Sequence, residues 1–252
     1  MDCAAVSRTL AQAPPQQQSA ATATADTELN AASAMIGRAL FLRCLCENDN
    51  LTYDAAGTLT GTVKRADWTV SGMDVAKVSR KNSAIVLEGV RVAVRFNADR
   101  REFDRKPQPN EPIHVTIATT SDAHTFDNAL QLIFAQGIDR KLQAATPPYW
   151  QHYFDPLLKW PDDLSSASIL SIPAATADTT PAAMTHRADT GYTIWAARDH
   201  VAGNVVLHLV VDAEGNPRRI GINTPLGYGL DEKAAEAAEK YRFNPARSQG
   251  KA

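Results

Sequence analysis

Residues 203–245 carry the most regular hydrophobic pattern of the chain. Every second residue in its first part is apolar: Val205, Leu207, Leu209 and Val211. This alternation predicts a β-strand with one apolar face. A turn-forming stretch at 212–217 follows, and Ile220 and Ile222 then continue the apolar alternation. Strand, turn and strand together predict a β-hairpin whose apolar face needs a covering element.

A helix that could cover this face follows the hairpin. Gly227 and Gly229 allow a tight entry into it, because glycine takes a positive φ without steric cost. Asp231 is predicted to be the N-cap, and Leu230 to pack back onto the first turn. These four residues are the predicted structural motif of the helix start. One face of the helix is then formed by Leu230, Ala234, Ala235, Ala238 and Tyr241.

The order of these segments resembles the C-terminal domain of the TonB family. The resemblance is carried by Gly203–Leu207, Val210–Asp212, Gly215, Leu226–Ala234 and Tyr241–Ala246. The family pattern has a hydrophobic strand that ends in Val-Asp, a glycine turn, a Gly-Leu-Asp helix start and an aromatic-Arg-Phe-x-Pro-Ala close. The ordered series is fairly specific and covers residues 190–252.

The resemblance implies a periplasmic module with a ββαβ order of elements. In the family this module transmits inner-membrane proton-motive energy to outer-membrane receptors for siderophores, cobalamin and similar solutes. An extended receptor segment adds to a sheet edge, so no catalytic side chain is needed. We expect this pairing at Tyr241, Arg242, Phe243, Asn244, Pro245 and Ala246. The implied partner is an outer-membrane TonB-dependent receptor, joined by an inner-membrane proton-channel complex if an N-terminal anchor exists.

The chain departs from the family pattern at both ends. Family energy transducers carry an N-terminal transmembrane helix, whereas the longest apolar run here, Val205–Val211, is far short of the roughly 20 residues that cross a bilayer. The N-terminus also lacks the pattern of a signal peptide. The family domain continues into a final strand, but this chain ends at Gly250-Lys251-Ala252. We therefore expect the last strand to be missing, and the location to be the periplasm or cell envelope.

The rest of the chain divides by composition into three parts. Residues 1–28 are rich in Ala, Gln, Thr and Pro and are predicted to be a disordered lead-in. Residues 29–160 are predicted to be a β-rich domain with flanking helices, because short β-branched runs follow one another there. Residues 161–185 are the predicted linker, and residues 186–252 the TonB C-terminal-like module. The predicted fold class is α+β.

Four local predictions concern the β-rich domain. The spacing of apolar residues predicts a helix over 29–43, and Ser121 or Asp122 is predicted to cap a second helix. The proline-containing stretch 99–112 is predicted to be a charged, solvated loop. The most aromatic stretch, 147–156, either forms a stacking platform for a ligand or, as we favour, closes the end of the domain.

Charge and motifs argue against several classes of protein. Lysine and arginine number 26 against 28 acidic residues, which gives nucleic-acid binding no support. Cys44 and Cys46 lack a second pair at metal-ligand spacing, and three cysteines imply no disulfide framework, so we expect two small half-buried residues at a helix end. The six histidines follow no metal or catalytic motif. We therefore expect no catalytic residue, no metal site and no cofactor.

Two hypotheses about function remain. In the first, the protein is a TonB-like energy transducer that supports transmembrane transport of solutes such as siderophores. In the second, it is a soluble periplasmic binding or adaptor protein whose β-rich domain recognises a ligand. An apolar segment of about 20 residues upstream would favour the first hypothesis, and a cleavable signal peptide the second.

Overall fold

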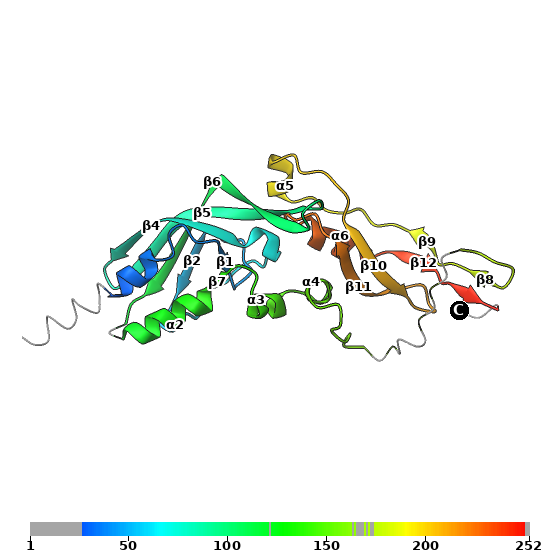
Figure 1. The fold of residues 1–252 in the computed structure, drawn as a ribbon, viewed down its shortest axis with the longest axis horizontal. Coiled ribbons are helices and arrows are strands. Elements are labelled where there is room, and N and C mark those ends of the chain that lie inside the picture. Colours follow the sequence, from blue (N-terminus) through cyan, green and yellow to red (C-terminus); the bar gives the residue numbers. More distant parts are fainter. Residues whose placement is uncertain are drawn as a thin grey trace, which may run out of the picture.

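Residues 27–120, 122–162, 164, 169, 171 and 174–249 are described in the computed structural model of the protein. The chain forms an elongated molecule with a large sheet at one end and a smaller strand–helix module at the other (Figure 1). It has the α+β class predicted from the sequence. The predicted lead-in lies outside the described residues except for its last two, which begin a helix over 27–33. Among the helices described, none has the length and apolar character needed to cross a membrane.

The large sheet has seven strands in the order β3-β2-β6-β5-β4-β1-β7. They are β1 (Leu40–Leu42), β2 (Asn50–Tyr53), β3 (Leu59–Thr60), β4 (Gly72–Lys81), β5 (Ala84–Asn97), β6 (Glu102–Ala118) and β7 (Phe134–Gln136). Neighbouring strands are antiparallel except β2 and β6, which are parallel. The prediction of a β-rich domain is therefore confirmed, and β4, β5 and β6 form a meander within the sheet.

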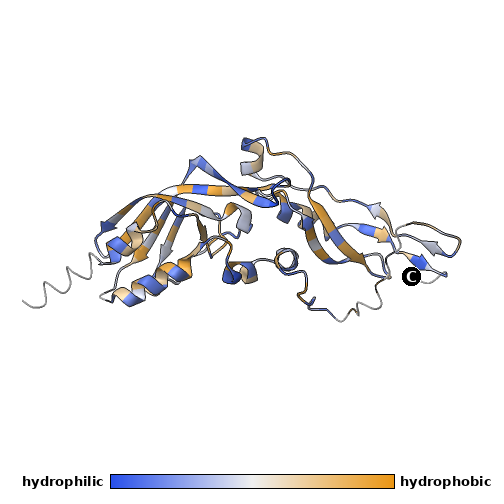
Figure 2. Cartoon of the chain, in the orientation of Figure 1, coloured by the Kyte–Doolittle hydropathy of each residue, from blue (hydrophilic) through white to orange (hydrophobic). Residues whose placement is uncertain are grey.

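Helix α2 (Ala123–Ile133) packs on this sheet because one side of it is apolar. Phe126, Leu130 and Ile133 are buried in the main core together with side chains of the sheet. Figure 2 shows this apolar stripe beside the hydrophilic outer side of α2. Asp122 is the N-cap, and its Oδ1 accepts a hydrogen bond from the backbone N–H of His124 at 3.1 Å. The second predicted helix and its candidate cap Asp122 are thus confirmed, whereas the other candidate, Ser121, lies outside the described residues.

The predicted helix over 29–43 is wrong in its second half. The helix covers 27–33, and Leu40–Leu42 form β1, which pairs with both β4 and β7. Gly37 has a φ of 75°, a conformation that ends a right-handed helix. Pairing with two distant strands decides the structure of Leu40–Leu42, and helical spacing within a short window carries no information about such partners.

The expectation for the cysteines is also wrong. Cys44 and Cys46 form a disulfide, and they follow strand β1 rather than a helix. Leu45 between them has a φ of 47°. The fully buried guanidinium of Arg91 fixes this loop, because its Nη1 donates to the carbonyl oxygens of Cys46 and Val70, each at 3.1 Å. A disulfide closed over one residue cannot be recognised from cysteine counts, which inform only about longer loops.

The stretch 99–112 is not a loop, except for its turn. Most of it belongs to β6, which pairs with β5 from Glu102 to Ala118 with one register shift near Arg91. Proline is tolerated here because β2 lies against β6 only at 114–117, so around residues 107–112 one side of β6 has no strand partner among the described residues. The prediction of a loop was therefore wrong, because prolines are also compatible with a strand that has a free side.

The aromatic stretch lies inside the protein rather than forming a platform. It forms α4 (Pro148–Phe154), which is preceded by α3 (Arg140–Ala145). Trp150 is fully buried, and its ring centroid lies 5.1 Å from that of Trp68 in a short 3-10 helix, η1 (Trp68–Val70). Phe103 and Phe154 complete this aromatic cluster. The interpretation of the stretch as a closing segment agrees with this packing.

Asp139 offers a test of the local stability at α3. Its Oδ1 accepts hydrogen bonds from the backbone N–H of Leu142 at 2.8 Å and from Arg43 Nη1 at 2.9 Å. The bond with Arg43 is the main reason that the pKa of Asp139 is lowered to about 2. We expect Asp139→Ala to lower the free energy of unfolding by about 1–2 kcal/mol, measured by urea denaturation. The control Lys141→Ala, exposed on the same helix, should change little, and equal losses in both variants would contradict the capping role.

The C-terminal module begins with a helix and the predicted hairpin. Its elements are α5 (Ile194–Arg198), β10 (Val206–Val211), β11 (Pro217–Thr224), α6 (Leu230–Ala238), β12 (Arg242–Asn244) and β13 (Arg247–Ser248). Strands β10 and β11 pair antiparallel, which confirms the hairpin. Two short strands, β8 (Thr179–Thr180) and β9 (Ala183–His186), pair with β13 and β12 respectively. Part of the stretch predicted as a linker, 161–185, is therefore paired with the end of the module.

The module is joined to the large sheet through the backbone. Tyr228 donates its N–H to the carbonyl oxygen of Val94 at 3.0 Å, and Phe96 donates to the carbonyl oxygen of Leu226 at 3.0 Å. The segment before α6 thus forms an antiparallel β-bridge with β5, in which Gly227 pairs with Arg95. Gly229 also donates its N–H to Thr69 Oγ1 at 2.7 Å. The glycine-rich segment therefore both starts α6 and holds the two parts of the protein together.

Candidate functional site

The predicted binding residues lie at the free end of the C-terminal module. Tyr241 follows α6, the next three residues form β12, and Pro245 and Ala246 separate β12 from β13. Tyr241 and Phe243 are half-buried, with ring centroids 6.5 Å apart, whereas Arg242 is exposed. The alternation expected of a strand thus divides these residues into an inner and an outer set.

The inner set borders an apolar groove of about 430 Å³. The groove lies between the hairpin, α6 and β12, and its apolar lining includes Leu207, Leu209, Leu230, Ala234, Ala238 and Phe243. Leu207 and Leu209 are only half-buried, although they belong to the apolar face of the hairpin. The face that the sequence predicts to be covered by one alanine-rich helix is therefore covered incompletely, and apolar side chains remain accessible along it.

The backbone of β12 has partners on both sides. On one side it pairs with β9, with Phe243 opposite Met184 and Asn244 opposite Ala183. On the other side Phe243 donates its N–H to the carbonyl oxygen of Gly215 at 3.0 Å. Gly215 has a φ of 85°, and a Cβ there would lie 2.0 Å from the carbonyl oxygen of Phe243. In contrast, β10 pairs with β11 alone among the described strands.

The start of α6 differs from the prediction in one role. Gly227 and Gly229 have φ values of 94° and 72°, and Gly229 rather than Asp231 is the N-cap. Asp231 lies inside the first turn and is fully buried. Its carboxylate reaches back to accept hydrogen bonds from the N–H groups of Leu226 and Gly227, both at 2.7 Å. The carboxylate therefore fixes the loop before the helix. It does not cap the first turn of the helix, although the sequence predicted that it would. Leu230 is buried where α6 begins.

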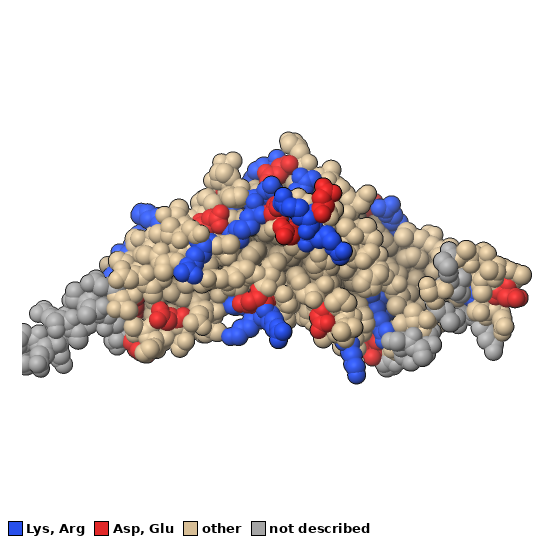
Figure 3. All heavy atoms as spheres, in the orientation of Figure 1, with Lys and Arg blue, Asp and Glu red and all other residues tan. Residues whose placement is uncertain are grey.

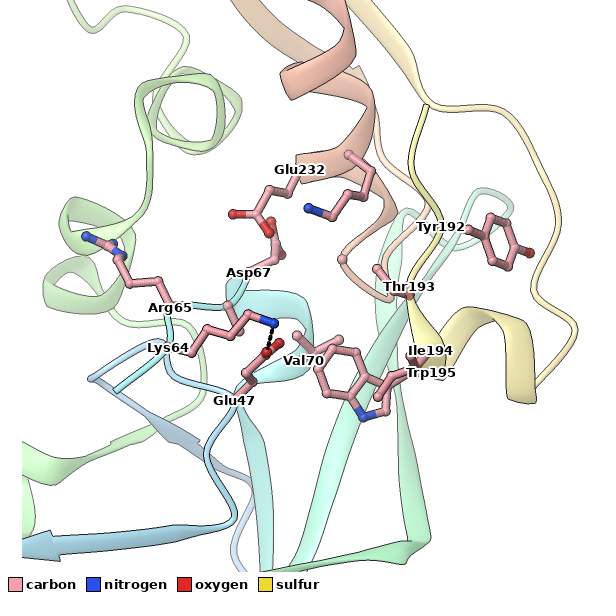
Figure 4. Close-up of a pocket in the computed structure, with 13 residues that line it drawn as sticks. Glu47, Lys64, Arg65, Asp67, Val70, Tyr192, Thr193, Ile194, Trp195 and Glu232 are labelled. Carbon is pink, nitrogen blue, oxygen red and sulfur yellow. Dashed lines mark ion pairs between the residues drawn. The ribbon is translucent and has the colours of Figure 1, made fainter. Parts of the chain in front are cut away.

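A second group of polar residues lies where the module meets the large sheet. Figure 4 shows Asp67 and Glu232 pointing toward one another in a pocket that also contains the ion pair of Lys64 and Glu47. Asp67 comes from the loop before η1, whereas Glu232 comes from the first turn of α6. The buried Asp67 carboxylate accepts hydrogen bonds from the N–H of Thr69 at 2.8 Å and from Trp150 Nε1 at 2.7 Å.

Burial and mutual repulsion raise the pKa values of these acids. Burial is the main reason that the pKa of Asp67 lies above its usual range. The pKa values of Asp231 and Glu232 are both raised to about 7, first by burial and then by the charge of Asp67. Lys233 at this junction bonds Glu236 at 2.9 Å. At this junction three carboxyl groups are therefore harder to ionise than carboxyl groups in water.

Possible metal ligands and surface charge bear on what the described residues could bind. No three His, Cys, Asp or Glu side chains in this part of the chain are placed to hold a metal ion. On the face seen in Figure 3, basic and acidic side chains are intermixed near the middle, and most of the surface is uncharged. Some of the charged side chains of the protein form ion pairs, such as Arg198 with Glu111 and Arg105 with Asp74. The visible face thus lacks the basic strip that is typical of nucleic-acid binding.

The fold and the site define a class: an α+β protein that ends in a small strand–helix module with an open apolar groove. Residues 191–252 match the family model described as the C-terminal domain of the Gram-negative bacterial TonB protein. Searches of curated proteins and of solved structures find no match. The resemblance predicted from the sequence is therefore confirmed for the C-terminal segment. Domains of this family interact with outer-membrane receptors, and the family's proteins belong to the cell envelope.

Two features of the site were not predicted. The pairing of β9 with β12 joins residues separated by nearly the whole module, and Ala183–His186 has no alternating apolar pattern that would mark it as a strand. The junction carboxylates come from segments far apart in the chain. The one usable signal for Asp67 is its position two residues before Thr69, which is typical of a capping aspartate.

Proposed function

We propose that this protein is a TonB-like protein of the cell envelope that contacts outer-membrane receptors by β-strand pairing. Through this contact it supports the transmembrane transport of solutes such as siderophores. The observation that carries the proposal is the family match over residues 191–252. The proposal assigns the protein no catalytic residue, metal or cofactor, since its work is the transmission of force or binding energy through a backbone contact.

The geometry of the module supports pairing with an extended segment. Strand β12 carries the residues at which pairing is expected, and its strand partner among the described residues is the short, exposed β9. A sheet edge of this kind can pair with an extended segment. The groove beside it exposes Leu207 and Leu209, which supplies an apolar surface for alternate side chains of the incoming segment. Backbone hydrogen bonds would supply affinity, and the groove would supply selectivity.

The alternative function is that of a periplasmic adaptor or binding protein. It is favoured by the joint between the module and the seven-stranded sheet, where the backbones of Val94 and Tyr228 pair directly. Because of this connection, a module bound to a receptor would also bring the seven-stranded sheet close to the receptor. The sheet could then present a ligand or a second partner there. Both hypotheses share the receptor contact and differ in what the seven-stranded domain contributes.

Binding to a receptor segment tests the proposal. The probe is a synthetic peptide from the extended periplasmic segment of an outer-membrane receptor encoded in the same genome, measured by isothermal titration calorimetry against the full chain. We expect binding, and we expect Phe243→Ala to weaken it about tenfold, since about 1.4 kcal/mol of apolar contact would be lost.

A matched control separates the groove from general effects on the protein. Leu132→Ala removes a half-exposed apolar side chain from α2, at the far end of the molecule. This variant should bind the peptide like the unmodified protein. Absence of binding by all receptor segments encoded in the genome, or an equal effect of both substitutions, would contradict the proposal.

A further inference from the structure

We propose that β9 is a built-in occupant of the β12 edge, and that an extended partner segment binds there by taking the place of β9. The inference deepens the proposed function, and the identity of the natural partner rests on it. The strand exchange itself is a property of this chain alone. It explains how residues predicted to bind a partner can already be paired inside the protein.

The contact between β9 and β12 is made almost entirely by the backbone. All four residues of β9 are exposed, and Met184 keeps half of its surface accessible. Within the described residues β9 pairs with β12 alone, and the two form a separate two-stranded sheet. An isolated two-stranded ribbon is only marginally stable in water. Little apolar burial therefore opposes the release of β9.

The ribbon is also interrupted. Strands β9 and β12 form one short ladder, and β8 and β13 form another beyond it. Pro181 lies between β8 and β9, and Pro245 lies between β12 and β13. Proline has no N–H to donate, so the ladder cannot continue through these positions. Each half of the ribbon can consequently open without the cooperation of a longer sheet.

The opposite side of β12 has contacts that do not depend on β9. Phe243 bonds the turn of the hairpin through Gly215, and its side chain lines the apolar groove. Release of β9 would therefore leave β12 in place with one unpaired edge. That is the arrangement a partner strand requires, because the edge it joins is already ordered.

The register indicates which segment would fit. Met184 lies opposite Phe243 and lines the groove, so an apolar side chain is favoured at that position of the partner. His186 lies opposite the exposed Arg242, where an acidic side chain would pair better than histidine. The partner is thus an extended segment with an apolar residue followed, two positions on, by an acidic one.

The exchange can be tested with the strand's own sequence. The probe is a fluorescent synthetic peptide with the sequence of residues 179–188, and its binding to the full chain is followed by anisotropy. If β9 occupies the edge for most of the time, the apparent affinity is reduced by the fraction of open molecules. We expect the double variant Met184→Gly, Thr185→Gly to bind the peptide about tenfold more tightly than the unmodified protein. The control Ala182→Gly, in the gap between the two ladders, should not.

A locked form provides the opposite test. Ala183 and Asn244 face each other across the ladder, so Ala183→Cys with Asn244→Cys allows a cross-strand disulfide. In a Cys3→Ser background, the oxidised variant should lose peptide binding, whereas the Ala183→Cys single variant should keep it. Hydrogen exchange gives a readout without peptide. The β12 amides that face β9, unlike the Phe243 amide that bonds Gly215, should exchange faster than those of β10 and β11, and oxidation should slow them.

The outcomes separate this inference from the proposed function. Equal peptide binding by the glycine variant and the unmodified protein, or full binding by the oxidised variant, would overturn the exchange. A receptor segment that binds the locked and unlocked forms equally would also overturn it, while leaving the proposed function intact. Peptide exchange without binding of any receptor segment would support the exchange and contradict the proposed function.

Discussion

Gly227→Ala is expected to destabilise the protein by roughly 3 kcal/mol or more, because it places a methyl group inside the joint between the two parts. A Cβ at residue 227 would lie 2.1 Å from the carbonyl oxygen of Val94 and 2.9 Å from the Cα of Arg95. Both contacts are with backbone, which cannot rotate away. The φ of 94° adds conformational strain for any residue with a side chain. Relief requires that the segment before α6 move off the edge of β5.

Gly61→Ala is the matched control for this effect. Gly61 has a similar φ of 88°, but a Cβ at this residue would have no atom within 4 Å among the described residues. The control therefore carries the conformational strain without the collision, and should cost about 1–2 kcal/mol. Urea denaturation followed by tryptophan fluorescence measures both variants. Equal destabilisation would show that the backbone contact at Val94 contributes nothing beyond φ, and that the two parts are joined elsewhere.

The sequence was most informative where structure depends on nearby residues. The alternation from Val205 to Val211 predicts the hairpin strand, and the capping pattern at Asp122 predicts the start of α2. In both cases the relevant partners lie within one turn or one strand. The family resemblance could also be recognised from nearby residues, because its pattern of strand, glycine turn and helix start lies within residues 191–252.

The sequence was less informative where distant partners decide. Leu40–Leu42 has helical spacing but forms a strand, because β4 and β7 lie on either side of it. Prolines at 107–112 would exclude a strand that has neighbours on both sides. Here β6 pairs with β5 alone, so the prolines are tolerated in the strand. The same limit applies to the candidate site. The binding residues were placed on a strand, but β9, which covers their edge, carries no local signal.

We also expect the free energy of unfolding to fall by a few kcal/mol between pH 5 and pH 8, because of the carboxyl groups at the joint. The pKa of the fully buried Asp231 is raised to about 7, whereas in the unfolded chain it has an ordinary value near 4. Between these values the folded protein holds a proton that the unfolded chain has released. Rising pH therefore lowers the free energy of unfolding until about pH 7, above which it becomes constant. For Asp231 alone, the rise of its pKa on folding corresponds to roughly 4 kcal/mol over the whole range from about pH 4 to pH 7.

The groups that face this cluster set the size and sign of the effect. Asp67 repels both Asp231 and Glu232, whereas Lys233 and Arg65 favour the charged form of Glu232. Away from this cluster, His152 acts in the opposite direction. Burial lowers its pKa, so its contribution to stability rises with pH up to about 6.5. The fall in stability caused by the carboxyl groups is therefore partly offset by His152.

Glu232→Gln isolates the carboxyl part of the slope. Glutamine keeps the size of the side chain but cannot ionise, so the variant should match the unmodified protein at pH 5 and exceed its stability at pH 8. The pKa of Glu232 is raised to about 7, but the side chain is partly exposed, so screening by solvent reduces the expected gain to about 1 kcal/mol. Urea denaturation at both pH values measures it, with Glu214→Gln, exposed in the hairpin turn, as the control. A gain at pH 5 as large as that at pH 8 would show that ionisation of Glu232 does not weaken the joint.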